Sequence, residues 1–248
     1  MRSINKNIFR EISKSKGRFM SIFLICAIGV GFFSGVRETG NDMKVSADIL
    51  YDEQELFDLR VLSTFGLTDG DVRSISEVND VTEVLASKYS DLALHFDNKE
   101  YLTRVYSWNN DEMNKVIINL GRAPAADNEC IISQNKLDNS FAIGDVVTMA
   151  DLTDAEEFPL ERKEFTIVGT FDTPMYISAT QKGSTTIGDG ALDAFMYVTE
   201  SNFTQDVYTE IYIRSDKLKD MQSYSDEYEQ LRDEISEELE QLGISRSE

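Results

Sequence analysis

The chain of 248 residues has few of the side chains on which catalytic and metal sites depend. It contains one histidine, one tryptophan, two cysteines and three prolines. The HExxH, GxSxG, CxxC and Walker phosphate-loop motifs are absent. The lone histidine, His95, stands in a stretch of alternating residues and is interpreted as structural. We therefore expect no catalytic residue, no cofactor and no metal ion, and we do not expect an enzyme.

The scarcity of cysteine excludes an internal disulfide. Cys26 lies in the apolar segment described below, whereas Cys130 lies in the polar remainder, so the two side chains cannot pair. A domain without a disulfide must be stabilised by its core, and about 200 residues suffice for that. We expect one domain with a sizeable core, or two subdomains.

Basic residues are scarce after residue 37. The first 37 residues hold 7 of the 24 lysines and arginines and one of the 45 acidic residues, so the rest carry a net charge of −27. Such a surface repels nucleic acids and anionic lipid headgroups, which excludes a nucleic-acid partner. The simplest interpretation of the negative charge is solubility.

Charged residues are absent from residues 19–36. As a helix this segment is about 27 Å long, close to the ~30 Å hydrocarbon core of a bilayer. Six basic residues and one acidic residue precede it, and an excess of lysine and arginine marks the cytoplasmic side. We predict a transmembrane helix over residues 19–37 in the cell membrane, with the N-terminus in the cytoplasm and residues from about 38 outside.

A cleaved signal peptide is the alternative to this membrane anchor, since it also has a basic start and an apolar core. The apolar core here exceeds the usual length of roughly 7–15 residues. Phe33 or Glu38 stands where a cleavage site needs a small residue. These features favour an uncleaved helix.

Both flanks of the membrane segment have helical patterns. In residues 1–18 isoleucine recurs every fourth position, which predicts a basic amphipathic helix on the inner leaflet; a disordered basic tail is the alternative. A seven-residue apolar repeat predicts a stalk helix over residues 38–56. This repeat consists of Val36, Met43 and Leu50.

One face of the membrane helix is lined by glycine residues. Gly31 and Gly35 form a small-xxx-small pair, which permits two helices to approach closely. We expect this face to pack against another transmembrane helix, supplied by a partner or by a missing part of the protein.

The residues after the stalk alternate between strand and helix patterns. Residues 57–62 alternate with period two, and Thr68 followed by Asp71 predicts the start of a helix over residues 68–78. One long strand is expected over residues 81–96. After a turn at 97–99, further strands are expected at 100–106, 115–119, 129–133, 145–149, 163–171, 194–199 and 207–213.

These elements predict an α+β fold, with a mixed sheet and helices on one face, carried on the stalk helix. The outer segments resemble two halves of a split βαβ layer. A β-rich subdomain, about residues 107–200, is expected to be inserted between them. The topology requires residues 57–62 and 207–213 to share a sheet.

The C-terminal segment, residues 216–248, has a heptad-like pattern. We expect one helix over residues 216–242 as the start of a coiled coil, ending at Gly243. A helix of this length exceeds the face of a small domain, so its distal half should be uncovered and fray. An antiparallel returning helix beyond residue 248 would cover it and would be followed by a strand completing the second βαβ half. The apolar seam consists of Met221, Tyr228, Leu231, Ile235 and Leu242.

Several short motifs follow one another in a recognisable order. Leu-Gly-Arg-Ala-Pro at 120–124 precedes Asn-Glu-Cys-Ile-Ile-Ser at 128–133 and Ile-Gly-Asp-Val-Val at 143–147, and strands like 165–169 and 195–199 follow. This order resembles MacB-like periplasmic core domains, the extracytoplasmic domains of FtsX-type ABC permeases. The resemblance implies such a domain over residues 57–215. Its signature residues, which we expect to be structural, are Gly121, Pro124, Glu129, Ser133, Gly144, Asp145 and Gly169.

The resemblance also implies a mechanism. ATP hydrolysis by a cytoplasmic ABC ATP-binding subunit would move the membrane helices and, through the stalk, the ectodomain. Family substrates range over lipoproteins, peptides and lipid-linked molecules. Family permeases have at least four membrane spans, whereas no apolar run near 18 residues follows residue 37. We therefore expect an N-terminal fragment or half of a split permease; the alternative is a single-pass receptor or binding module with an extracellular sensing domain.

Overall fold

The computed structural model describes residues 14–108, 113–133, 141–153, 157–176 and 182–247. Most of the amphipathic helix expected over residues 1–18 lies outside this part of the chain. The protein divides into two compact units, residues 1–48 and residues 49–248. Each unit is described by itself below.

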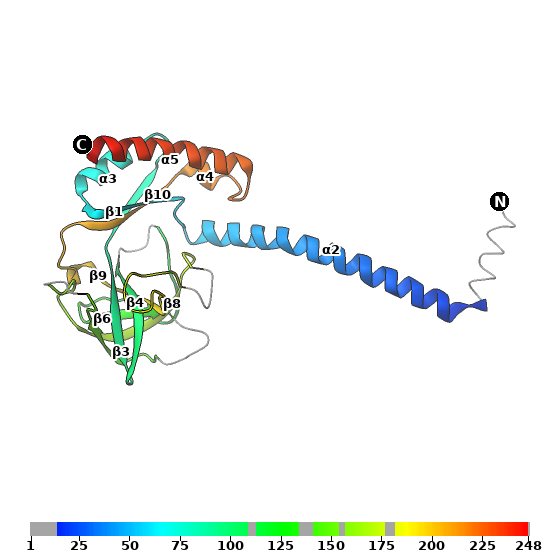
Figure 1. Cartoon of the computed structure of the whole chain (residues 1–248), viewed down its shortest axis with the longest axis horizontal. Coiled ribbons are helices and arrows are strands. Elements are labelled where there is room, and N and C mark those ends of the chain that lie inside the picture. Colours follow the sequence, from blue (N-terminus) through cyan, green and yellow to red (C-terminus); the bar gives the residue numbers. More distant parts are fainter. Residues whose placement is uncertain (1–13, 109–112, 134–140, 154–156, 177–181, 248) are drawn as a thin grey trace. The chain divides into compact units, whose positions relative to one another are not determined.

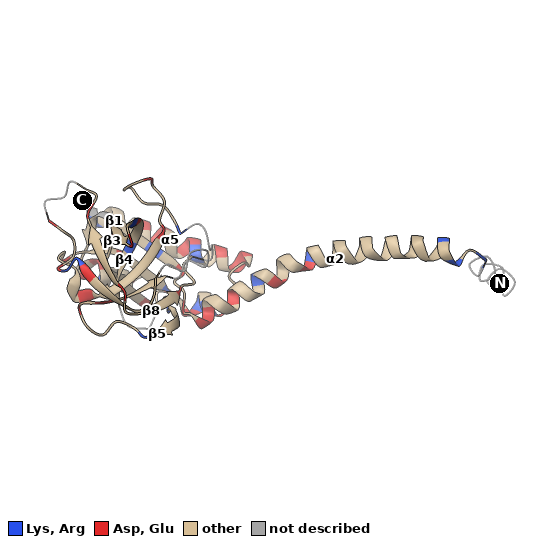
Figure 2. Ribbon diagram, turned by 90° about the horizontal axis from the view of Figure 1, so that it is seen from below, with Lys and Arg blue, Asp and Glu red and all other residues tan. Residues whose placement is uncertain are grey.

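The first unit consists of most of helix α2 (Lys16–Glu53), which also enters the second unit. The helix is unbroken over 38 residues, and its uncharged stretch is visible in Figure 2 as a tan segment. In the described residues α2 is the one helix long and apolar enough to cross a membrane, by length and composition. The prediction that the apolar helix continues past residue 37 is confirmed, because α2 ends at Glu53.

The second unit contains a three-stranded sheet in the order β1-β10-β2. Its strands are β1 (Leu59–Leu67), β2 (Glu83–Ser87) and β10 (Tyr208–Arg214). Strand β10 is antiparallel to both neighbours, so β1 and β2 are parallel and are joined by helix α3 (Asp69–Ser76). This is a split βαβ unit, and the predicted pairing of the first and last strands is confirmed.

Helices cover one face of this sheet (Figure 1). Helix α3 begins at Thr68, whose backbone N–H donates to the Asp71 carboxylate at 2.7 Å, as the capping pattern predicted. Helices α4 (Asp216–Lys219) and α5 (Asp226–Ser247) follow β10. The apolar residues between the helices and the sheet form one core cluster, which includes Leu67, Ile75, Ile211, Ile213, Leu239 and Leu242.

The remaining strands form a second, mixed sheet that closes on itself. Strand β7 pairs with both β3 and β8, so the order β8-β6-β9-β4-β3-β7 forms a six-stranded barrel, and β5 adds to β8. The pairs β4–β9 and β6–β8 are parallel and the others antiparallel. The short helix η1 (Glu200–Asn202) follows β9. The strands are β3 (Tyr89–Phe96), β4 (Lys99–Trp108), β5 (Ile117–Gly121), β6 (Glu129–Ser133), β7 (Val146–Ala150), β8 (Glu164–Asp172) and β9 (Ala194–Thr199).

Alternate residues of the barrel strands fill its interior, as the period of a strand requires. Leu92 and Leu94 of β3 meet Val147 and Met149 of β7 and Met196 of β9 in one buried cluster. The turn predicted at residues 97–99 is confirmed as the tight β3–β4 hairpin. The mixed α+β fold inferred from the sequence is therefore confirmed.

Several predicted boundaries are wrong, and three of them concern the division between the sheet and the barrel. Strand β1 extends to Leu67 instead of ending at residue 62. The strand expected over residues 81–96 is interrupted at Lys88, where the chain passes from the sheet to the barrel. Lys88 is fixed there because its C=O accepts a hydrogen bond from the Ser107 N–H at 2.9 Å. The inserted subdomain therefore begins at β3 and not near residue 107.

The prediction for the C-terminal helix is also wrong. Instead of one helix over residues 216–242, a turn separates α4 from α5, and α5 continues past Gly243 to Ser247. Its distal half is not uncovered: Ile235 is buried, and Leu239 and Leu242 pack on the sheet. The helix fits because it lies along the sheet instead of projecting from it.

Gly243 provides a test of this correction. Gly243 lies inside a helix, and in the part of the chain that the structure describes no atom outside the adjoining helix backbone lies within 4 Å of where its Cβ would be. Replacing Gly243 with alanine should raise the free energy of unfolding by about 0.5–1 kcal/mol, because alanine loses less backbone entropy. The measurement is urea unfolding of the detergent-solubilised chain, followed by fluorescence of its single tryptophan, Trp108. A loss of stability would show that the helix ends at Gly243.

Candidate functional site

The end of α2 is fastened to the sheet of the second unit. Glu55 has φ +49°, and the Leu56 N–H donates to the Tyr51 C=O at 2.9 Å while the Glu55 N–H donates to the Asp52 C=O at 3.2 Å. These two bonds form a Schellman motif, which ends a helix abruptly. A left-handed residue other than glycine is held there only by its surroundings.

The Glu55 side chain provides those surroundings. Its carboxylate lies 2.5 Å from Arg214 Nη1, at the end of β10, and 2.9 Å from Lys219 Nζ of α4. Arg214, only 6% exposed, also pairs with Glu83 of β2 at 3.2 Å. Burial opposes ionisation of Glu55, but the Lys219 hydrogen bond and the charge of Arg214 outweigh it and lower the pKa of Glu55. We call Glu55, Glu83, Arg214 and Lys219 the junction cluster.

The barrel subdomain also contacts the end of α2. In the connection between β4 and β5, the Asn114 N–H donates to the Glu55 C=O and the Lys115 N–H to the Gln54 C=O, both at 2.9 Å. The Phe57 N–H donates to Asn114 Oδ1 at 3.0 Å. The residues after the helix are therefore bonded to both subdomains of the second unit.

Asp58 extends this network to α5. Its carboxylate accepts hydrogen bonds from the Ser215 N–H and the Tyr228 hydroxyl, both at 2.9 Å. Burial raises the pKa of Asp58, although these hydrogen bonds favour the ionised form. A cavity of about 300 Å³ lies beside these groups. Its walls include Tyr51, Phe57, Leu218, Tyr224 and Tyr228.

The arrangement holds the end of α2, β10, α4 and α5 together. In the part of the chain that the structure describes, no three His, Cys, Asp or Glu side chains are placed to hold a metal ion. Sequence reasoning did not find the junction cluster, because its members are single charged residues far apart in the chain. The sequence feature that could have pointed to the cluster is Arg214, a charged residue that ends the otherwise uncharged segment Ile211–Arg214 of the buried strand β10.

A second buried carboxylate, Glu210, lies on the face of the sheet opposite the helices. It accepts a hydrogen bond from the Tyr212 hydroxyl and lies 3.5 Å from Arg60 Nη1. Burial is the main cause that raises the pKa of Glu210. Because the carboxylate is both hydrogen-bonded and paired, we interpret it as structural.

The glycines predicted to pack in the membrane lie on α2. Gly31 and Gly35 are exposed, and no described atom lies within 4 Å of where a Cβ would be at either position. Their contact with another helix stays a prediction.

The structure brings most of the predicted signature residues together around β5 and β8. Gly121 pairs with Gly169 across these strands and has φ +79°. A Cβ on Gly121 would lie 2.1 Å from the Val168 C=O, and one on Gly169 would lie 2.5 Å from the Arg122 C=O. Both positions therefore require glycine. Beside them, the Gly144 N–H donates to the Ile167 C=O at 2.8 Å.

The other signature residues complete turns. Pro124 is buried, and Asp145 Oδ2 accepts the Ala142 N–H at 2.8 Å. Ser133 lies apart from the rest, at the far end of β6, where its Oγ accepts the Phe195 N–H and the Lys182 ammonium, each at 2.9 Å. These contacts are those of structural residues.

Glu129 closes the corner after β5. Its carboxylate pairs with the Arg122 guanidinium at 2.5 Å and accepts the Ala125 N–H at 2.9 Å. The Arg122 hydrogen bond and then the Ala125 N–H lower the pKa of Glu129 to about 2.

This pKa predicts a pH dependence of stability. A carboxylate with a lower pKa in the folded state stabilises the fold above its unfolded pKa, so the contribution of Glu129 is full above about pH 5. It is lost as the pH falls from 4.5 toward about 2. Thermal unfolding of the chain and its Glu129→Gln variant should therefore differ at pH 7 and converge only as the pH approaches about 2. A difference that does not change with pH would contradict the assignment.

The chain was compared with protein families and with solved structures. The model of the family described as MacB-like periplasmic core domain matches residues 19–231. The chain is similar to the extracellular domain of the noncanonic ABC-type transporter YknZ from Gram-positive bacteria, at 16% identity and TM-score 0.38 over 62% of this chain and 75% of that one. It is also similar to the periplasmic region of MacB from Actinobacillus actinomycetemcomitans, at 13% identity and TM-score 0.40 over 73% and 75%.

None of the curated proteins compared with the chain matches it in sequence. The family model, in contrast, runs from the apolar segment of α2 into α5 and includes both subdomains. The motif order between residues 120 and 147 had indicated the same relationship. The chain belongs to the family of MacB-like periplasmic core domains.

Proposed function

We propose that this chain is the membrane-anchored extracytoplasmic portion of an ABC-transporter permease. ATP hydrolysis by a partner subunit moves the ectodomain, for the export or extraction of a lipoprotein, a peptide or a lipid-linked molecule. The N-terminus is cytoplasmic and residues from about 38 are extracytoplasmic. Membership of the MacB-like family and the apolar stretch of α2 support this assignment.

The junction cluster supports the proposal that movement of the membrane helix is transmitted to the ectodomain. Helix α2 ends in a Schellman motif, and Glu55 directly after it is paired with Arg214 and Lys219. A flexible connection would dissipate a movement of the helix, whereas a paired and hydrogen-bonded one passes it to β10 and α4. The ectodomain needs no catalytic group for this role, because the partner subunit hydrolyses the ATP.

The experiment uses the complete permease, reconstituted with its ATP-binding subunit. Hydrogen exchange at residues 50–58 and in β10 should change with ATP, and this change should disappear when ATP hydrolysis is blocked. Exchange inside the barrel, at β6, serves as the control and should stay constant. Exchange that is identical with and without ATP would contradict mechanical coupling.

The face of α2 that contains Gly31 and Gly35 is proposed to contact another membrane helix of the permease. Replacing both Gly31 and Gly35 with leucine should weaken assembly and leave membrane insertion intact, because larger side chains prevent close approach. The measurement is crosslinking through a cysteine placed on that face. Unchanged crosslinking would count against the contact.

A single-pass receptor with an extracellular sensing domain is the second candidate. The one candidate span in the described residues is compatible with this function and with the permease. The neighbouring genes distinguish the two: an adjacent ATP-binding subunit supports the permease, and an adjacent kinase or regulator supports the receptor.

A further inference from the structure

The cavity beside the junction cluster has the features of a small-molecule site. It lies between the end of α2, α4 and the start of α5, and every residue that lines it belongs to the second unit. Its volume of about 300 Å³ is at the lower end of the range of ligand pockets, about 300–1,000 Å³. The proposed transmission of movement uses the charged groups at its wall and assigns no role to the space itself.

Aromatic rings form much of the wall. They belong to Tyr51 near the end of α2, Tyr224 between α4 and α5, Tyr228 in the first turn of α5, and Phe57. The hydroxyls of Tyr51 and Tyr224 lie 3.4 Å apart, although the two residues are far apart in the sequence. Leu218, which is fully buried, adds an aliphatic surface. Such walls suit an apolar group, and the faces of aromatic rings attract cations.

Asp58 supplies an oriented polar group at the wall. Its Oδ1 accepts the Tyr228 hydroxyl and its Oδ2 accepts the Ser215 N–H, both at 2.9 Å. An ionised carboxylate has about four acceptor positions, so the bonds to described residues leave about two for a ligand. Because these bonds already fix the carboxylate, a ligand would not have to order it on binding.

The wall carries more negative than positive charge. It has two basic groups and three carboxylates, which are Arg214, Lys219, Asp52, Glu55 and Asp58. Both basic groups pair with Glu55, and Arg214 also pairs with Glu83, which lies outside the wall. Burial raises the pKa of Asp58, and the nearby charge of Asp52 raises it further. A cation beside Asp58 would relieve this repulsion, whereas an anion would increase it.

We propose that this cavity binds a protonated primary amine that carries an apolar group. The ammonium group donates hydrogen bonds to the Asp58 carboxylate, and the apolar group lies against Tyr51, Tyr224 and Leu218. A primary ammonium fits better than a quaternary one, because it has N–H groups for the remaining acceptor positions of Asp58. The inference goes beyond the proposed function and does not rest on it.

The bound amine would contact two helices at once, since Tyr51 belongs to α2 and Tyr228 to α5. It would therefore stabilise the end of α2 against local opening. With the free amine at ten times its dissociation constant, opening that releases the ligand should become about tenfold rarer. Hydrogen exchange at residues 50–58 measures this change.

The test compares three probes of nearly the same shape. Phenethylamine is the cation, 2-phenylethanol is the neutral isostere, and 3-phenylpropionate is the anion. Each is titrated by calorimetry into the full chain in nonionic detergent at pH 7, and the titration of detergent alone is subtracted. We expect the amine to bind at least about tenfold more tightly than the alcohol, because only the amine forms charge-assisted hydrogen bonds with Asp58. The acid should bind most weakly.

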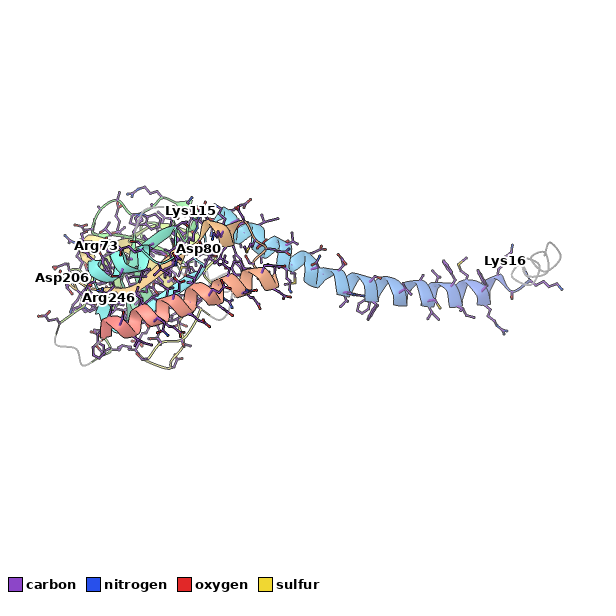
Figure 3. The ribbon with its side chains drawn as sticks, turned by 90° about the horizontal axis from the view of Figure 1, so that it is seen from above. Lys16, Arg73, Asp80, Lys115, Asp206 and Arg246 are labelled. Atoms are coloured by element: carbon purple, nitrogen blue, oxygen red, sulfur yellow. The ribbon has the colours of Figure 1, made fainter. Side chains whose placement is uncertain are left out.

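Two variants locate the site. Asp58→Asn removes the charge and keeps the shape, so it should weaken binding of the amine by about tenfold. Tyr224→Leu removes an aromatic face and should weaken it by about threefold. This variant should fold, because Tyr224 is 42% exposed. The control is Asp80→Asn: Asp80, labelled in Figure 3, lies between α3 and β2, pairs with Lys217 and is outside the cavity wall.

A preference for the amine that both variants reduce and the control keeps supports the proposal. Equal affinities of the amine and the alcohol overturn it, and tighter binding of the acid overturns it in favour of an anion site at Arg214 and Lys219. If Asp58→Asn does not fold, Tyr224→Leu and the order of the three probes still decide.

A further arm identifies the source of the amine. The peptide Phe-Gly-Gly amide presents the same ammonium group and ring at a peptide N-terminus. Binding as tight as that of phenethylamine supports the site and assigns it to a peptide N-terminus, whereas weaker binding supports it as a site for a small molecule. None of these results depends on ATP or on a partner subunit, so they can fail while the proposed function holds.

Discussion

Replacing Gly121 with alanine should lower the free energy of unfolding by about 3 kcal/mol. The added Cβ would lie 2.1 Å from the Val168 C=O and 2.9 Å from the Gly169 Cα, so the paired strands β5 and β8 would have to separate. Overpacking of this kind costs about 1–3 kcal/mol, and the left-handed φ of +79° adds about 1 kcal/mol. Urea unfolding of the full chain, followed by Trp108 fluorescence, measures the loss.

Gly144 is the matched control for this substitution. It also has a left-handed φ, +97°, but among the described residues no atom beyond its chain neighbours lies within 4 Å of where its Cβ would be. The Gly144→Ala variant should therefore lose only the conformational term, about 1 kcal/mol. Equal losses at the two positions would show that the backbone conformation, and not the contact with β8, makes Gly121 necessary.

The positions of the barrel strands were predictable because strands half buried in a core alternate with period two. Residues 129–133 and 194–199 were predicted with the bounds that β6 and β9 have. The start of α3 was equally predictable, because Thr68 and Asp71 form a capping pair within four residues. Local chemistry thus determined these elements.

The closure of the barrel could not be predicted in the same way. It depends on β7 pairing with both β3 and β8. The paired residues of β3 and β7 lie more than 50 positions apart in the sequence. The break at Lys88 has the same origin, since Ser107 of a later strand fixes it. An alternating pattern shows that a strand has a buried face but not which strand it meets.

The C-terminal helix shows how a local pattern can mislead. The apolar spacing from Met221 to Leu242 suggested one continuous seam, but the chain turns between α4 and α5. Once α5 is turned onto the sheet, Ile235, Leu239 and Leu242 are packed against it instead of facing a coiled-coil partner. Heptad-like spacing is also the spacing of a helix that lies on a sheet.

The candidate site was the least predictable part. The signature glycines Gly121 and Gly169 were predicted from the family resemblance, and the close backbone contacts of both positions explain why only glycine fits there. The junction cluster had no such signal, because Glu55 follows the stalk and Arg214 ends a strand more than 150 residues later. Single charged residues become recognisable as a site only when the fold brings them together.

Replacing Arg214 with leucine should lower the free energy of unfolding by about 2–3 kcal/mol. Arg214 is 6% exposed and neutralises both Glu55 and Glu83, whose side chains are 21% and 46% exposed. Removing one partner of a buried pair costs about 3–5 kcal/mol, and the partial exposure of the two carboxylates reduces this figure. Hydrogen exchange at residues 50–58 should increase at the same time, because the left-handed Glu55 loses the contact that holds it.

Lys217 provides the control, because its ammonium group pairs with Asp80 at 2.6 Å but is 63% exposed. The Lys217→Leu variant should lose less than about 1 kcal/mol and leave exchange at residues 50–58 unchanged. A double-mutant cycle of Arg214→Leu with Glu55→Gln measures the interaction free energy between the two side chains. If the carboxylate and the guanidinium act as a pair, the double variant loses less free energy of unfolding than the sum of the two single losses. Additive losses would mean that Arg214 stabilises β10 alone, and the end of α2 would then be held by the backbone hydrogen bonds from Asn114 and Lys115.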